Sequence, residues 1–237
     1  MRYAYHQAKK NWLKEMRISV FHQNLTCDGQ FKFALNTSMI DTLKILRQAG
    51  FFKQFGSLTD DEILGKILEE RKDAFTNNIG YPYDSGSNLS DQELASQDTL
   101  KVLHLDLEAD VCMENQVYTW LLQRLGEISG RDNILTDVIE EWKSEAGPIE
   151  LRYKLNGDEK FSQPHYLDDW VDQAFIDTIL EEISNVINER FHICLGPEEE
   201  WFGQDVTYMR LTIEERNILE ERLGWKFFDD FLNRMRE

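Results

Sequence analysis

Apolar and polar residues alternate strictly between Leu100 and Val111. The apolar positions are Leu103, Leu105, Leu107 and Ala109, and the polar positions are His104, Asp106, Glu108 and Asp110. A period of two predicts a strand with one buried and one solvated face. Shorter β-prone runs cover residues 192–195 and 205–211, whereas residues 134–142 fit a strand or a helix.

Apolar residues recur at helical spacing in several other segments. These segments are 7–17, 38–48, a run after Thr59, 114–128, 171–191 and 212–223. Three of the helix starts carry a hydroxyl residue followed three positions later by Glu, a pattern that caps two free amides. The pairs are Thr59 and Glu62, Ser90 and Glu93, and Thr212 and Glu215.

Two dipeptides predict β-hairpins, because both of their residues tolerate a positive φ. Asp28-Gly29 lies between β-prone runs at 18–27 and 30–35. Asn156-Gly157 lies between runs at 149–155 and 159–161.

Apolar residues become sparse between Asn77 and Asp98, which predicts a long loop. We interpret it as a boundary between an N-terminal unit (1–98) and a C-terminal unit (99–237); the alternative is a functional loop within one domain. The predicted fold class is α+β. A mostly antiparallel sheet with helices packed on one face follows a smaller hairpin-plus-helix N-terminal unit.

Charge narrows the range of partners. The 237 residues include 26 Lys and Arg against 44 Asp and Glu, a formal net charge of −18. This charge disfavours nucleic acid and anionic membranes and favours a basic protein partner, or serves only to keep the protein soluble. The N-terminal residues lack the apolar core of a secretory signal, and three distant cysteines indicate a reducing compartment, so we expect a cytoplasmic protein.

The polar row His104, Asp106 and Glu108 is the first candidate for chemistry, as a set of metal ligands. Neighbours along one strand face are about 6–7 Å apart, so three of them converge poorly on one ion. The alternative is a solvated strand face. A second candidate combines Asp137 with Glu141 and Lys143, the skeleton of a metal-dependent nuclease site.

Other catalytic patterns are missing from the sequence. It contains no nucleophile elbow, phosphate-binding loop, dinucleotide fingerprint or zinc spacing. No cofactor is therefore predicted, and the sequence favours a non-catalytic protein.

The most acidic stretch runs from Tyr166 to Trp201 and interleaves carboxylates with aromatic residues. Carboxylates steer and pair with Lys and Arg while aromatic rings bury apolar area, so we predict a partner-binding surface. Its predicted members are Asp168, Asp169, Trp170, Asp172, Glu181, Glu182, Glu198, Glu199, Glu200 and Trp201. The alternative is a solvated helix face with aromatic residues in the core.

Three functional hypotheses follow. The first is a non-catalytic acidic protein that binds a basic protein, most concretely an immunity or antitoxin-type protein that neutralises a bacterial toxin nuclease. The second is a metal-dependent hydrolase or nuclease that uses the carboxylate and His candidates. The third is a subunit of an assembly that docks through the aromatic segment 225–232.

Overall fold

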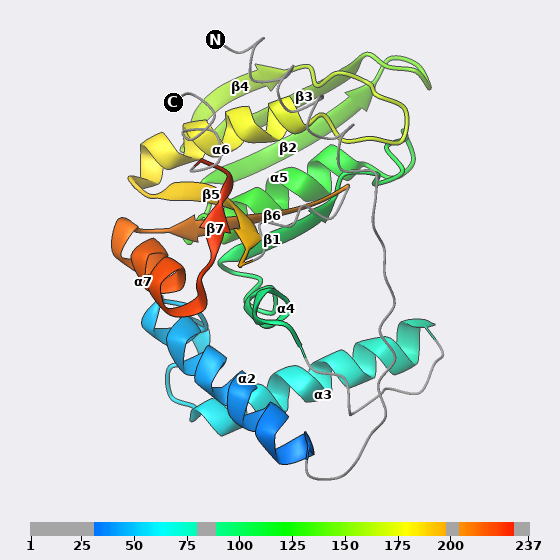
Figure 1. Ribbon diagram of the computed structural model, residues 1–237. Coiled ribbons are helices and arrows are strands. Elements are labelled where there is room, and N and C mark those ends of the chain that lie inside the picture. Colours follow the sequence, from blue (N-terminus) through cyan, green and yellow to red (C-terminus); the bar gives the residue numbers. More distant parts are fainter. Residues whose placement is uncertain (1–30, 80–88, 198–203, 230–237) are drawn as a thin grey trace, which may run out of the picture.

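The computed structural model describes the backbone of residues 31–79, 89–197 and 204–229 and the side chains of 39–70, 89–197 and 204–229. Helices and strands alternate irregularly along the chain (Figure 1). The elements are α2 (Phe31–Gln48), η1 (Lys53–Phe55), α3 (Asp60–Ile79), α4 (Asp91–Ala95), β1 (Val102–Asp106), α5 (Val117–Ile128), β2 (Leu135–Trp142), β3 (Ile149–Leu155), β4 (Asp158–Ser162), α6 (Gln173–Ile187), β5 (Arg190–Gly196), β6 (Asp205–Leu211), α7 (Ile213–Leu223) and β7 (Lys226–Phe227).

The strands form two antiparallel sheets, which confirms the α+β class. The larger sheet has the order β1-β6-β5-β7 and the smaller one the order β2-β3-β4, where the sequence had suggested a single sheet. Figure 1 shows the smaller sheet at one end of the molecule, the larger sheet in the middle, and α2 and α3 at the other end.

The first hydrophobic core joins the two sheets through α5 and α6. One face of the larger sheet contributes the core residues Leu103, Leu105, Val206, Tyr208 and Ile193. The inward residues of β3 and the apolar faces of α5 and α6 complete this core.

The second core lies on the opposite face of the larger sheet. Val102, Cys194, Met209 and Leu211 point there and contact apolar residues of α2, α3, α4 and α7. The larger sheet therefore separates the two cores and contributes residues to both. The second core takes residues from both sides of residue 98. The division of the chain at residue 98 stays a prediction.

Most local patterns are confirmed. Burial alternates along β1 as expected, with His104 and Asp106 exposed. All three capping boxes form, including that of Thr59, whose hydroxyl accepts from the Glu62 amide at 3.3 Å. Residues 134–142 resolve to strand β2, and positive φ angles at Asn156 and Gly157 close the β3–β4 hairpin.

The first predicted hairpin is wrong in its second arm. Residues 30–35 were expected to be a strand, but α2 already begins at Phe31. No Gly or Pro interrupts residues 31–48, so nothing stops the helix that Met39, Leu43 and Leu46 anchor in the second core from extending upstream. The first arm and the predicted helix 7–17 lie outside the described residues.

Candidate functional site

Two segments that are sixty residues apart lie side by side next to the end of β1. The amide of Val171 donates to the Leu107 carbonyl at 2.8 Å, and that of Ala109 donates to the Asp169 carbonyl at 3.0 Å. Glu108 and Trp170 face each other in an antiparallel bridge. The pairing thereby joins two candidate clusters that the sequence analysis had treated separately.

The result is a surface that we call the acidic face. It comprises Asp106, Glu108, Asp110, Asp168 and Asp169, together with Leu167 and Trp170. The five carboxylate residues are exposed, and none of them forms an ion pair with another described residue. The two apolar members are 48% and 41% exposed. Carboxylates without a described cationic partner thus lie on the same paired segments as two exposed apolar side chains.

His104 and Asp205 border the acidic face. The Nε2 atom of His104 lies 3.7 Å from Asp205 Oδ1, and its Nδ1 atom lies 3.0 Å from Thr207 Oγ1. Asp106 instead accepts from the Glu108 amide at 2.9 Å and from Gln204 Nε2 at 3.1 Å. His104 therefore contacts β6 through both of its ring nitrogens.

The other predicted partner-binding residues are dispersed. Asp172 is buried and caps α6, so its carboxylate faces backbone amides and not solvent. Glu181 is exposed on α6, whereas Glu182 is half-buried and pairs with Lys160 at 3.2 Å. Residues 198–201, which include the predicted Glu198, Glu199, Glu200 and Trp201, lie outside the described residues.

The metal-ligand candidates do not converge. His104, Asp106 and Glu108 share one strand face, yet no group of three or more His, Cys, Asp and Glu among the described residues is placed to hold a metal ion. In the smaller sheet, Asp137 pairs with Lys154 at 2.7 Å.

The other carboxylate of the predicted nuclease site is similarly engaged. Glu141 lies 3.4 Å from both Lys143 and Arg152. These charges form pairs on the exposed face of the smaller sheet.

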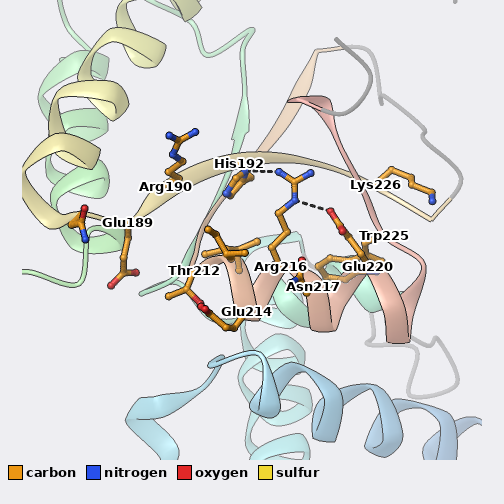
Figure 2. A pocket seen from close by; sticks show the side chains of 13 residues that line it. Glu189, Arg190, His192, Thr212, Glu214, Arg216, Asn217, Glu220, Trp225 and Lys226 are labelled. Carbon is orange, nitrogen blue, oxygen red and sulfur yellow. Dashed lines mark hydrogen bonds and ion pairs between the residues drawn. The ribbon is translucent and has the colours of Figure 1, made fainter. Parts of the chain in front are cut away.

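A separate pocket of about 1090 Å³ opens between β5, α7 and the start of β7 (Figure 2). Its lining is polar and of mixed charge. The lining residues are Asn188, Glu189, Arg190, His192, Leu211, Thr212, Ile213, Glu214, Arg216, Asn217, Glu220, Trp225 and Lys226. Three stretches of the chain contribute them, and no sequence motif connects these stretches.

A small charge network forms one wall of the pocket. The Nδ1 atom of buried His192 lies 3.0 Å from Asp229 Oδ2 and 3.2 Å from Arg216 Nη1, as Figure 2 shows for the arginine. Arginine can only donate and a carboxylate can only accept, so Nδ1 serves one of them at a time. The hydrogen bond with His192, reinforced by the charge of Arg216, lowers the pKa of Asp229.

The described lining residues of this pocket include no Cys or Ser. The Thr212 hydroxyl accepts from the Glu215 amide at 3.2 Å and caps α7. An imidazole and a carboxylate without a nearby nucleophile do not form a nucleophilic catalytic unit. The pocket therefore gives the catalytic hypotheses no specific support.

Cys194, near the pocket on β5, is predicted to resist alkylation in the folded protein. Burial raises the pKa of its thiol to about 12, so only about one thiol in ten thousand is ionised at pH 8. We expect iodoacetamide at pH 8 to leave Cys194 unmodified in buffer and to modify it fully in denaturant, as read by peptide mass spectrometry. Half-buried Cys112 is the internal control and is expected to react first. Equal labelling of the two folded thiols would contradict the prediction.

Comparison with known proteins adds no assignment. No family model matches the chain, and no curated protein or solved structure is significantly similar to it. None of the helices in the described ranges is both long and apolar enough to cross a bilayer.

Proposed function

We propose that this chain is a non-catalytic binding protein that engages a basic protein partner through the acidic face. One observation carries the proposal: the pairing of residues 107–111 with residues 167–171 gathers five carboxylates around two exposed apolar side chains. A carboxylate without a cationic neighbour attracts Lys and Arg of a partner more strongly than one that is already paired.

The apolar members of the acidic face can supply binding energy, to which exposed charges contribute little. Exposed carboxylates mainly accelerate encounter and select the sign of the partner, whereas binding energy concentrates in a few buried aromatic and apolar contacts. Their exposure supports Trp170 and Leu167 as candidates for such anchors. The net charge of −18 extends the attraction beyond the contact surface.

In its most concrete form, the protein is an immunity or antitoxin-type protein of a bacterial cytoplasm that masks a basic toxin nuclease. A nuclease needs cationic surface to hold phosphate, so an acidic protein that covers this surface blocks its substrate. Capture from native lysate at low salt, with elution in a rising salt gradient and mass spectrometry, tests this form. Recovery of one basic protein is expected. If only background elutes, the proposal fails.

Neutralising the face is predicted to weaken partner binding roughly 100-fold at low salt. The change combines Asp106→Asn, Glu108→Gln, Asp168→Asn and Asp169→Asn, at about 0.7 kcal/mol for each exposed charge. The dissociation constant is measured by calorimetry at several salt concentrations. Its salt dependence is expected to become shallower, because fewer charges face the partner.

A control variant with the same change in net charge distinguishes the effect of the acidic face on affinity from that of the protein's overall electrostatic field. It neutralises four exposed carboxylates elsewhere, namely Asp61, Glu69, Glu214 and Glu221. This control is expected to change affinity by less than about fivefold. Equal losses in the two variants would show that overall charge, and not the acidic face, governs binding.

A further inference from the structure

Strand β1 forms one edge of the larger sheet. It pairs with β6 on one side, and the order β1-β6-β5-β7 places no described strand on the other. Val102 to Asp106 stand opposite Met209 to Asp205 in a continuous antiparallel register. The direction in which each backbone group points therefore follows from this ladder.

The outward-pointing backbone groups belong to the even-numbered residues. Arg210 donates to the Lys101 carbonyl at 3.1 Å and Leu107 donates to the Gln204 carbonyl at 2.9 Å, so the odd-numbered residues bond to β6. In an antiparallel ladder their neighbours point the other way. The amides and carbonyls of His104 and Asp106 consequently face outward, and no described backbone group bonds to them.

Helix α5 contacts the segment just before this edge and carries an exposed aromatic side chain on the same flank. Arg124 Nη2 on α5 donates to the carbonyl of Thr99, just before β1, at 2.7 Å. Trp120 lies one turn earlier on the same flank of α5, since residues four apart on a helix are neighbours. Its side chain is 45% exposed although the helix is otherwise well packed. The flank of α5 that bonds to the residue before β1 therefore carries an uncovered aromatic ring.

The other end of the edge leads into the acidic face. Asp106 belongs to both, and Glu108 and Asp110 continue the chain beyond it. We infer that β1 receives an extended basic segment of the protein partner as an added strand. This inference rests on the proposed function and specifies how the partner is recognised.

Strand addition uses the backbone for affinity and alternate side chains for specificity. A segment laid along β1 offers its amides and carbonyls to those of His104 and Asp106. Its Lys and Arg side chains on one face then meet the exposed carboxylates of Asp106 and Glu108. The added segment and β1 thereby form hydrogen bonds between backbone groups that otherwise bond only to water.

Charge favours a basic occupant over a second copy of this chain. Two β1 edges paired with each other would place Asp106 near its counterpart or near His104, with the rest of each acidic face close by. Like charges on paired strands are destabilising. Acidic side chains on an edge strand are one way in which proteins prevent pairing with themselves.

The test uses two synthetic peptides of equal charge and length. The first alternates Thr and Lys over eight residues, and the second carries N-methyl groups on its four central amides, which removes donors on both of its edges. We expect the first peptide to bind at least tenfold more tightly at low salt. Hydrogen exchange of the His104 and Asp106 amides in the unaltered protein is expected to slow with the first peptide only.

A pair of variants isolates the outward amide. His104→Pro removes a donor that makes no bond to β6, and proline is tolerated at such edge positions. His104→Ala loses the same side-chain contacts but keeps the amide. The Pro variant is expected to bind the first peptide about fivefold more weakly than the Ala variant, as for one lost hydrogen bond. If the Pro variant is unfolded by circular dichroism, the exchange measurement decides.

The possible outcomes distinguish strand addition at β1 from the proposed function on which it rests. Equal, salt-dependent binding of both peptides without slowed exchange would overturn strand addition but leave the acidic face in place. If neither peptide binds at low salt, the proposed function fails as well. If the His104 and Asp106 amides already exchange slowly without peptide and sedimentation shows a dimer, the edge is occupied by a second copy and the inference is overturned.

Discussion

Replacing Lys101 with Met is expected to lower the free energy of unfolding by about 3 kcal/mol. Its ammonium lies 2.7 Å from Glu215 Oε2, and the two side chains are only 4% and 12% exposed. It also lies over the ring of Phe51 at 5.2 Å. Removing the cation leaves a nearly buried carboxylate with exposed Lys53, at 3.4 Å, as its remaining cationic partner. Urea denaturation followed by circular dichroism measures the change.

The Glu215→Gln change supplies the matched control. Gln at this position still completes the capping box of α7, so its effect isolates the charge. We expect the double variant to be more stable than the sum of the single losses predicts, because replacing a buried ion pair by uncharged residues costs little. Strictly additive losses would show that the pair is not energetically coupled.

The same pair gives the protein an acid-sensitive contact. Burial raises the pKa of Glu215, but the hydrogen bond and charge of Lys101 outweigh it, and the net pKa lies below the ordinary 4.5. A carboxyl group whose pKa is lowered by folding stabilises above its unfolded pKa and loses this contribution as pH falls through the folded value. The stability of Lys101→Met should accordingly fall less steeply below about pH 4.5 than that of the unaltered protein.

Replacing Asp172 with Ala is expected to cost about 2–3 kcal/mol in the free energy of unfolding. Its carboxylate accepts from the amides of His165 at 2.9 Å, Ala174 at 3.1 Å and Phe175 at 3.4 Å. All three amides lose this partner in the variant. Chemical denaturation with an unchanged m-value is the expected signature.

Asp169→Ala is the control for this change, because Asp169 is exposed, belongs to the acidic face and has an ordinary negative φ. It should alter stability by less than about 0.5 kcal/mol while weakening partner binding. A large stability loss in this control, or none in Asp172→Ala, would contradict the roles that we assign to these neighbouring carboxylates.

Short-range patterns predicted most of the elements because their causes are local. The alternation along β1 and the turn at Asn156-Gly157 depend on residues within a few positions of each other. The capping box of Thr212 and Glu215 likewise needs only four consecutive residues. The hairpin at Asp28-Gly29 was wrong in its second arm because the deciding contacts of α2 with the second core are distant in sequence.

Distance along the chain also explains which contacts could not be predicted from the sequence. Nothing near Glu108 indicates that Trp170 will face it, and nothing near His192 indicates Arg216 or Asp229. Asp172 is different, since an Asp directly before an apolar helical run is a recognisable N-cap. That signal identifies Asp172 as an N-cap from the sequence alone and argues against a place for it in the partner-binding set.

The two cores described above meet at β6. Val206 and Tyr208 point into one core and Met209 and Leu211 into the other, while β1 and β5 cover both edges of the strand. The four β6 residues that point into these cores are buried, so solvent cannot accommodate a change of side-chain size at these positions. Sequence change in this protein should therefore be least tolerated at these four buried positions of β6.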